Sequence, residues 1–275
     1  MELTDHIAKA ASLIRAADGM IVTAGAGMGV DSGLPDFRGR RGFWKAYPAL
    51  GRQGIHFEDI ANPATFLDNP RLAWGFYGHR LQLYRSIVPH EGFQLLRELA
   101  ARMPHGAFVY TSNVDGQFQK AGFSDNRVVE CHGSIHHLQC MHTCTSDIWS
   151  AASLAVDVDT DACELRSPLP TCLSCGRIAR PNILMFGDWS WISDRADAQK
   201  ANFEAWRKTV LRPVVVEIGA GVDLPTIRHK GASLRAPLIR INPEEAEVEG
   251  PENVGLSLGS LEALQRISAA LGLAI

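Results

Sequence analysis

Hydrophobic residues fall into short runs along this chain, and amphipathic segments separate several of the runs. Apolar runs typical of buried parallel strands span residues 19–24, 107–111, 183–186, 214–218 and 238–241. Apolar residues recur at helical spacing in residues 3–14, 92–103 and 261–273. Strands that alternate with helices predict an α/β fold, in which a parallel sheet carries helices on both faces. Ligands of such sheets bind at the carboxyl ends of the strands.

Two stretches interrupt this alternation. Residues 39–89 are rich in aromatic side chains, and residues 136–180 hold five of the six cysteines. We expect both to be insertions that form a smaller lobe beside the sheet. The predicted sheet domain therefore comprises residues 1–40, 90–135 and 181–275, and the predicted small domain comprises residues 41–89 and 136–180.

Composition narrows the classes of function. The chain has 275 residues, 46% of them hydrophobic, which is enough for a full core. A formal net charge of -3 favours neither nucleic acid nor a membrane surface as a partner. No apolar run approaches the roughly 18–20 residues that cross a bilayer. The first residues do not resemble a signal peptide, so we expect a cytoplasmic protein without structural disulfides.

A glycine-rich loop follows the first predicted strand. Its residues Ala24, Gly25, Ala26 and Gly27 allow a close approach of the backbone to a pyrophosphate. Val30 stands where the dinucleotide fingerprint has its third glycine, so an ordinary turn is an equally good interpretation of this loop alone. The charged and aromatic segment 34–39 directly after it favours a loop that covers a bound cofactor.

Three polar residues follow two other predicted strands. Asn113 and Asp115 come after residues 107–111, and His132 comes after the short run 128–131. Carboxamide and carboxylate groups can orient a sugar and a water, and a histidine can take a proton from a ribose hydroxyl. These groups suit cleavage of a nicotinamide–ribose bond, in which positive charge builds on the sugar. Taken singly, each residue fits a structural role better, such as an Asx turn for Asn113 and Asp115.

Four cysteines have the spacing of a zinc site. Cys140-x-x-x-Cys144 and Cys172-x-x-Cys175 are two pairs whose thiolates suit tetrahedral Zn²⁺. A site with four cysteines has no open position, so this zinc would be structural. His142 is an alternative ligand. Of the other cysteines, Cys163 is expected to be a plain thiol, and Cys131 should point away from the face that His132 uses.

Together these segments resemble the sirtuin family of NAD⁺-dependent protein deacylases, and within it the divergent microbial branches. The matching segments appear in the family's order: residues 25–27 and 32–39, Asn113-Val-Asp115, His132-Gly133, the two cysteine pairs, residues 180–182 and 186–188, and Ile241-Asn242. The resemblance implies a Rossmann-like large domain, a small domain with a helical and a zinc module, and NAD⁺ in the cleft between them.

The resemblance also implies roles for individual residues. The acyl oxygen of an acylated protein lysine would attack C1′ of the nicotinamide ribose, and nicotinamide and O-acyl-ADP-ribose would be released. His132 would act as general base, with Asn113 and Asp115 as the other catalytic residues. Phe186 and Gly187 would contact the substrate. The implied cofactor contacts are Ala24, Gly25, Ala26, Gly27, Ser32, Asp36, Phe37, Arg38, Ser112, Asn113, Val114, Asp115, Gly219, Ala220, Gly221 and Asn242.

The chain departs from the family pattern mainly on the substrate side. Ser112 replaces a usual glutamine, Gly29 stands where serine is common, and residues 219–225 form a shortened loop on one side of the peptide groove. Residues 188–191, on the other side of that groove, are also unusual. These departures keep a second hypothesis open, a protein ADP-ribosyltransferase or NAD glycohydrolase with the same cofactor pocket. A non-catalytic NAD⁺ sensor is a third hypothesis, which the presence of all three polar residues disfavours.

Tyr77 and Arg80 bear on the acyl group. In some sirtuins a tyrosine and an arginine at this spacing bind the carboxylate of succinyl- or malonyl-lysine. Because they are three residues apart on a helix, the two side chains share a face. The arginine guanidinium binds carboxylates through two parallel hydrogen bonds. A purely structural role in the helical module is the alternative.

Overall fold

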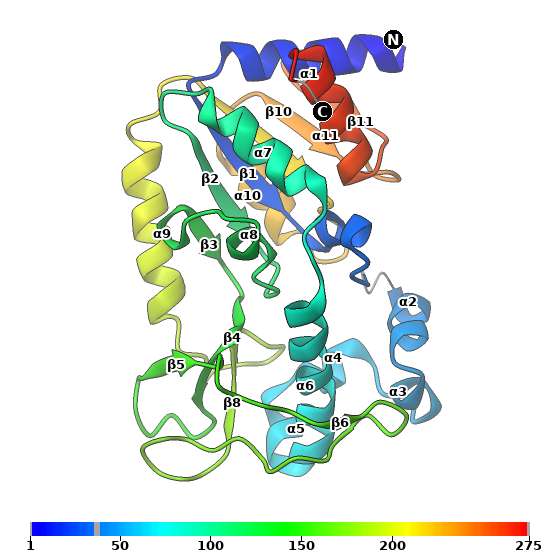
Figure 1. Ribbon diagram of the computed structural model, residues 1–275, viewed down its shortest axis with the longest axis vertical. Helices are drawn as coiled ribbons and strands as arrows, with labels where there is room; N and C mark the ends of the chain where they lie inside the picture. The colour runs from blue at the N-terminus through cyan, green and yellow to red at the C-terminus, as the bar shows by residue number, and fades with distance from the viewer. Residues whose placement is uncertain (1, 36–38, 274–275) are drawn as a thin grey trace.

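The computed structural model describes residues 2–35 and 39–273, which form two lobes stacked along the long axis of the molecule (Figure 1). The larger lobe contains a six-stranded sheet in the order β3-β2-β1-β9-β10-β11, with every neighbouring pair parallel. Counted along the chain this is the order 3-2-1-4-5-6 of Rossmann-type domains. Its strands are β1 (Gly19–Ala24), β2 (Ala107–Thr111), β3 (Val128–Glu130), β9 (Pro213–Ile218), β10 (Leu238–Ile241) and β11 (Val254–Leu256).

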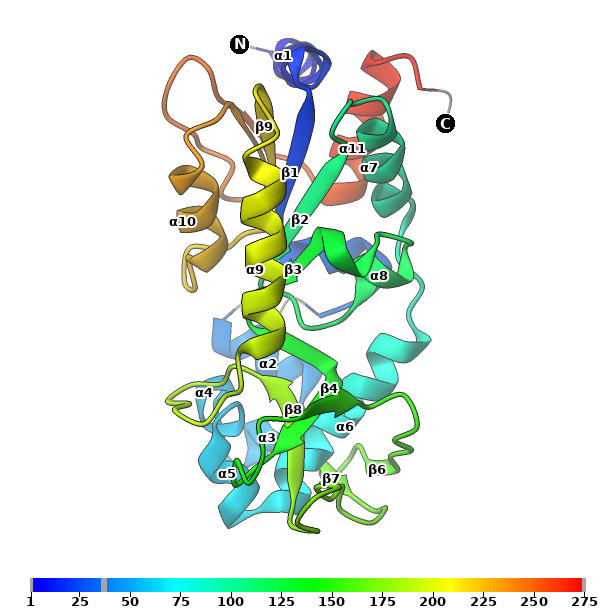
Figure 2. The same cartoon turned by 90° about the vertical axis from the view of Figure 1, so that its left-hand side faces the viewer.

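Helices cover both faces of this sheet, as the sequence predicts. Successive residues of β1 point to opposite faces. Met20 and Val22 pack in one hydrophobic cluster with α1 (Leu3–Ala16), α7 (Glu91–Ala101) and α11 (Ser260–Ala270). Ile21 packs in the other cluster, with α9 (Asp194–Arg207) and α10 (Thr226–Ser233). Figure 2 shows α9 and α10 on one side of the sheet and α7 and α11 on the other.

The smaller lobe combines helices with a short antiparallel sheet. Its core is aromatic: Trp74, Phe76 and Tyr77 on one helix are fully buried. Trp74 Nε1 donates a hydrogen bond of 2.9 Å to the carbonyl of Ala179, which joins the helical part to the sheet. The elements are α2 (Gly39–Ala46), α3 (Pro48–Arg52), α4 (Phe57–Ile60), α5 (Pro63–Asp68), α6 (Pro70–Ser86), the sheet of β4 (Gly133–Cys140), β5 (Ile148–Ser150) and β8 (Ala179–Ile183), and the hairpin β6 (Val158–Asp159) and β7 (Glu164–Leu165).

One predicted strand was wrong. The apolar run 183–186 was expected in the parallel sheet, but β8 ends at Ile183 and pairs antiparallel with β4 in the small lobe. The strand precedes that run and contains Arg180 and Asn182, whose buried polar side chains hide it from a hydrophobicity pattern. The three predicted helices are confirmed as α1, α7 and α11.

Short connecting elements complete the fold: η1 (Ala26–Ser32), α8 (Gln117–Lys120) and η2 (Asp125–Arg127). Strands β4 and β8 carry the chain from one lobe to the other (Figure 1). The residue bounds given above for the two domains stay a prediction. No helix within the described part of the chain is long and apolar enough to cross a membrane.

Candidate active site

A cavity of about 600 Å³ lies between the two lobes, and both lobes line it. The sheet contributes the loops after β1, β2, β3 and β9, which end at the same edge. Strands β1 and β9 are the neighbours at which the strand order reverses, the place where Rossmann-type sheets bind nucleotides. The small lobe contributes residues of α4 and α6 and the segment 183–186 that follows β8.

Glycines allow the loops after β1 and β9 to touch through their backbones. A Cβ atom on Gly25 would lie 2.7 Å from the carbonyl oxygen of Gly219, and one on Gly27 would lie 2.6 Å from the Cα of Gly219. Gly219 itself has a φ of +61°, which glycine adopts readily. The Gly27 N–H donates a 3.1 Å hydrogen bond to the Gly219 carbonyl. The predicted cofactor loop therefore packs backbone to backbone against the loop after β9 in the cavity wall. We call this contact of Gly25 and Gly27 with Gly219 the glycine crossing.

Not all predicted residues of the first loop reach the cavity. Ala26 is exposed and lines it, as do Gly25 and Gly27. Ala24 is fully buried in β1, and the hydroxyl of Ser32 accepts a 2.9 Å hydrogen bond from the His90 N–H, which ties the loop to the start of α7. Neither lines the cavity. Asp36, Phe37 and Arg38 lie outside the described residues.

The loop after β2 supplies four wall residues in a row: Ser112, Asn113, Val114 and Asp115. Asn113 Nδ2 donates a 3.0 Å hydrogen bond to the Gly25 carbonyl, so its amide is held against the glycine crossing. Its backbone N–H donates to the Thr111 hydroxyl at 3.0 Å. These bonds fix the position of Asn113 relative to the cofactor loop.

Asp115 is buried at the cavity wall. Burial raises the pKa of its carboxyl group to about 6, and the charge of Glu130 adds to that rise. A 2.9 Å hydrogen bond from the Gln117 N–H and the charge of Arg80 act in the opposite direction. Asp115 is therefore a carboxyl group that titrates near neutral pH.

His132 follows β3 and lines the same cavity. Burial lowers the pKa of its imidazole, so the neutral form that accepts a proton is the dominant form at pH 7. Its carbonyl accepts a 2.9 Å hydrogen bond from the Leu184 N–H. The next residue, Gly133, has a φ of +80°, and a Cβ there would lie 2.0 Å from the Asn182 carbonyl. Tight backbone packing on both sides thus fixes the histidine.

Cys131 points away from His132, as the strand alternation predicts. It packs with Phe108 and Phe203 in the hydrophobic cluster between the sheet and α9. Burial raises the pKa of its thiol to about 12. The buried thiol is therefore protonated at neutral pH, which disfavours a nucleophilic role.

The small-lobe wall contains Tyr77 and Arg80 of α6, which both line the cavity. Arg80 Nε and Nη2 donate hydrogen bonds of 2.8 and 2.6 Å to the Tyr84 hydroxyl. The guanidinium lies 5.2 Å from the centre of the Phe76 ring. A buried cation and aromatic side chains thus form part of the small-lobe wall of the cavity.

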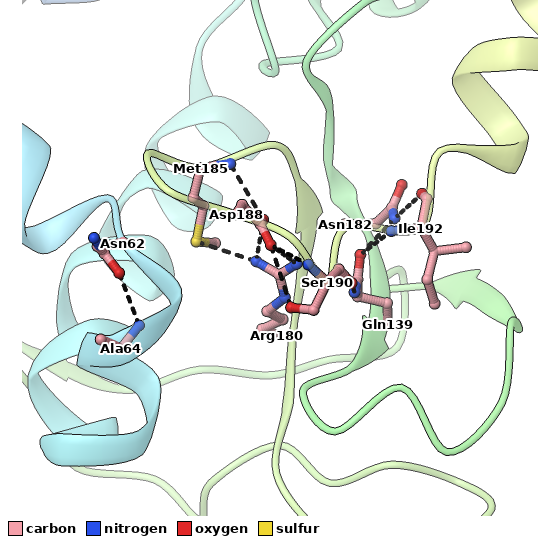
Figure 3. Close-up of polar contacts among 9 residues, drawn as sticks. All are labelled: Asn62, Ala64, Gln139, Arg180, Asn182, Met185, Asp188, Ser190 and Ile192. Atoms are coloured by element: carbon pink, nitrogen blue, oxygen red, sulfur yellow. Dashed lines mark hydrogen bonds and ion pairs between the residues drawn. The ribbon is translucent and has the colours of Figure 1, made fainter.

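The segment that follows β8 is anchored by a buried ion pair (Figure 3). Arg180 Nη1 and Nη2 lie 2.7 and 3.0 Å from the two carboxylate oxygens of Asp188, and both side chains are 0% exposed. Asp188 also accepts a hydrogen bond from the Ser190 N–H at 3.1 Å. Asn182 donates to the carbonyl of Ile192 at 2.9 Å. These bonds hold Phe186 at the cavity wall, whereas Gly187 does not line it.

Asn242 lies behind the cofactor loop. It is fully buried, and its Nδ2 donates a 3.0 Å hydrogen bond to the Ala220 carbonyl. Its Oδ1 accepts from the N–H groups of Glu244 and Glu245. Asn242 thus shapes the walls of a second hollow of about 160 Å³ that shares Gly27 and Gly219 with the main cavity. A direct contact of Asn242 with a cofactor stays a prediction.

The four cysteine sulfurs predicted to bind zinc lie within 4.8 Å of one another. The Cys140–Cys175 and Cys144–Cys172 sulfurs are 3.7 and 3.6 Å apart. Tetrahedral bonds of about 2.3 Å to zinc place sulfurs about 3.8 Å apart, so the set fits this ion. Thr143, with a φ of 45°, turns the chain sharply enough to accommodate the extra residue of the first pair. His142 is not part of this group among the described residues.

Comparison with known proteins agrees with this geometry. The sequence model described as the Sir2 family matches residues 25–217, which is more than half of the chain. The chain belongs to the Sir2 family.

Several curated relatives carry the same kind of name. The Sir2-family chain is 31% identical to an NAD-dependent protein deacylase of Deinococcus radiodurans, over 88% of this chain and 90% of the relative. It is 29% identical to one of Aquifex aeolicus, over 83% and 85% of the two chains. It is 30% identical to the mitochondrial NAD-dependent protein deacylase sirtuin-5 of Canis lupus familiaris, over 67% and 61% of the two chains.

Solved Sir2 structures have the same fold as this Sir2-family chain. A structure of a Sir2 enzyme, described in terms of its mechanism and regulation, superposes with a TM-score of 0.67 at 25% identity, over 98% of each chain. A Sir2 homologue in complex with NAD superposes with a TM-score of 0.66 at 23% identity, over 96% of this chain and 94% of the other. The predicted fold, a Rossmann-like domain with a smaller inserted lobe, is thereby confirmed.

Proposed function

We propose that this chain is an NAD⁺-dependent protein-lysine deacylase that produces nicotinamide and O-acyl-ADP-ribose. One observation carries the proposal: a single cavity joins the glycine crossing of β1 and β9 to Asn113, Asp115 and the neutral imidazole of His132. The names of the curated relatives support the same activity.

The cavity residues fit NAD⁺. The glycine crossing leaves no room for a Cβ at Gly25, Gly27 or Gly219, so backbone borders this wall where a dinucleotide would lie. NAD⁺, when bound, supplies an ADP-ribosyl group that is transferred from nicotinamide to the acyl oxygen of the substrate. Asn113, held by Gly25, would orient the ribose and carboxamide side of the cofactor. Further contacts proposed here are Ala26, Ser112, Val114, Ala220 and Gly221.

His132 would take a proton from a ribose hydroxyl. Its lowered pKa keeps the imidazole unprotonated at neutral pH, which is the state a general base requires. Asp115 lies in the same wall with a pKa of about 6, so it is mostly ionised above pH 7 and can offset positive charge that develops on the sugar. Phe43, Phe57 and Phe186 of the small lobe line the cavity and would shield the reacting bond from water.

Acetyl-lysine is the first substrate that we propose, and succinyl- and malonyl-lysine are the next candidates. Arg80 is a permanent cation in the cavity wall, and Tyr77 lies one helical turn before it. Acyl chains that end in a carboxylate would have a partner there. The four cysteines would hold a structural zinc that keeps the loop-rich part of the small lobe folded.

An ADP-ribosyltransferase or NAD glycohydrolase is the second candidate function. It is favoured by the short side chain of Ser112 in the cavity wall and by the short loop between β9 and α10, which begins at Thr226. The short loop changes the substrate side, whereas the glycine crossing, Asn113 and His132 remain in the cavity wall.

A peptide panel separates these functions. Purified protein is incubated with NAD⁺ and with acetyl-, succinyl-, malonyl- or unmodified lysine peptides, and the products are read by mass spectrometry. Nicotinamide release that requires an acylated peptide and yields O-acyl-ADP-ribose supports the deacylase. Release at the same rate without peptide, or an ADP-ribosylated protein acceptor, would instead establish the second function.

A further inference from the structure

Trp189 is a fully exposed aromatic side chain on a rigid segment. Its exposure is 99%, the highest among the exposed large hydrophobic side chains of the described chain. Its neighbours Asp188 and Ser190 are held in the hydrogen-bond network of Arg180, whose side chain is itself buried (Figure 3). The indole therefore projects into solvent from an anchored backbone. Exposed indoles of this kind are common anchors of protein partners, because they bury a large area with little loss of entropy.

The segment of Trp189 borders the candidate active site. Phe186, three residues earlier, lines the cavity, and its N–H donates a 2.9 Å hydrogen bond to the Ala61 carbonyl. The Phe186 ring also contacts the Phe57 ring, with centroids 5.8 Å apart. These contacts place the segment beside α4, whose exposed Glu58 lines the cavity as well.

The exposed charged residues that line the cavity, within the described chain, are both acidic. Glu58 lies on the small-lobe side, and Asp223 lies on the loop between β9 and α10. Arg80 and Asp115 are buried deeper in the wall. The exposed charge in the cavity wall is therefore negative, and Trp189 lies three residues along the chain from the lining residue Phe186.

Building on the proposed deacylase function, we propose that the preferred substrates carry an arginine or lysine next to the acylated lysine. The cationic side chain would lie against the Trp189 indole as a cation–π contact, with Glu58 or Asp223 as its counter-charge. In an extended substrate, neighbouring residues are about 3.3 Å apart along the chain. Residues beside the acyl-lysine therefore remain at the rim when the acyl group occupies the cavity.

The test is a set of acetyl-lysine peptides that differ only in the residues flanking the lysine, which are arginine, leucine or glutamate. Values of kcat/KM are measured at saturating NAD⁺. We expect kcat/KM for the arginine peptide to exceed that for the glutamate peptide about tenfold at low salt, and less in 0.5 M salt because exposed charges are screened.

Trp189→Ala should lower kcat/KM for the arginine peptide about three- to fivefold and leave kcat/KM for the glutamate peptide unchanged. Glu58→Gln and Asp223→Asn should each reduce the preference for arginine.

Leu211→Ala is the matched control. Leu211 is 81% exposed and lies just before the amino end of β9. The cavity lies at the opposite edge of the sheet, where the strands have their carboxyl ends. We expect it to leave every peptide unchanged. Trp189→Phe should restore most of the preference for arginine.

The outcomes separate this inference from the proposed function. Failure to release nicotinamide with every acylated peptide overturns both. Peptide-dependent release at equal kcat/KM for the three peptides overturns only the inference, and so does a preference for leucine over arginine. If Trp189→Ala instead converts a dimer to a monomer in size-exclusion chromatography, the indole is a contact between copies of the chain and the inference is wrong.

Discussion

At the scale of single residues, the catalytic proposal depends on the protonation state of His132. We expect His132→Ala to lower the rate of acyl transfer to O-acyl-ADP-ribose by about a hundredfold or more, and to leave NAD⁺ binding nearly unchanged. The histidine is proposed to move a proton, whereas the glycine crossing and Asn113 hold the cofactor. Calorimetric titration with NAD⁺ and a turnover assay measure the two properties separately. Loss of cofactor binding in this variant would show that the role is misassigned.

The pH dependence follows from two groups in the same wall. Burial lowers the pKa of His132 below 6.5, and burial raises that of Asp115 to about 6. Both groups are in their proposed active forms, neutral and ionised respectively, above these values. We therefore expect kcat/KM to be flat from pH 7 to 8 and to fall as the pH drops through about 6. A profile that already declines below pH 7.5 would contradict the lowered pKa of His132.

The sequence identifies these residues for a simple reason. Asn113, Asp115 and His132 each follow an apolar run by a few positions, and parallel strands end at one edge, so their convergence is predictable. The pKa of Asp115 cannot be predicted from the sequence, because it depends on burial and on the charges of Glu130 and Arg80, which are distant in sequence. The roles of Ser32 and Asn242 cannot be predicted from the sequence either. Their side chains form hydrogen bonds with backbone groups that are not part of any sequence motif.

At the scale of elements, the pair Arg180–Asp188 holds the segment between β8 and α9. Asp188→Asn leaves a buried guanidinium without its counter-charge, which costs about 3–5 kcal/mol in the free energy of unfolding. We expect urea unfolding to show this loss, and the KM for the peptide to rise more than the KM for NAD⁺. Asp159→Asn is the control, because its partner Arg166 is exposed and the pair should contribute little. Equal stability of the two variants would refute the anchoring role.

The zinc module is the second prediction at this scale. Cys175→Ala should reduce bound zinc, measured by elemental analysis, from one ion per chain to a small fraction, because one of four thiolates is lost. Cys163→Ala is the control, since this buried thiol lies outside the cluster and its loss should leave the zinc content unchanged.

Removal of zinc by a chelator tests the structural role of the metal. We expect chelation to unfold β5, β6 and β7 before the six-stranded sheet. A metal-free protein with unaltered thermal stability would disprove the structural role.

The pattern of residue types predicts some elements well and others poorly. Four cysteines in two closely spaced pairs predict the zinc site, and the fully buried run of β1 predicts a central strand. β8 escapes detection because its buried positions include the polar residues Arg180 and Asn182. Their hydrogen-bond partners are Asp188 and Met185 for Arg180, and Gln139 and Ile192 for Asn182. α9 is also hard to find, since most of its residues are polar and only four are buried. Contacts with residues distant in sequence, rather than local periodicity, determine the secondary structure of such segments.

At the scale of the whole molecule, the cavity walls come from both lobes, so a cofactor that fills the cavity should stabilise both. A ligand at a hundred times its Kd adds about 2.7 kcal/mol to the free energy of unfolding. For a chain of this size we expect NAD⁺ to raise the Tm by roughly 5–10 °C. Hydrogen exchange should slow in the loops after β1 and β9 and also in α4 and residues 184–186, which contribute to the small-lobe wall. Gly219→Val should abolish these effects, because its Cβ would lie 2.4 Å from Gly27, whereas Leu211→Ala should retain them. Protection confined to the sheet lobe would mean that the cofactor does not bridge the cavity.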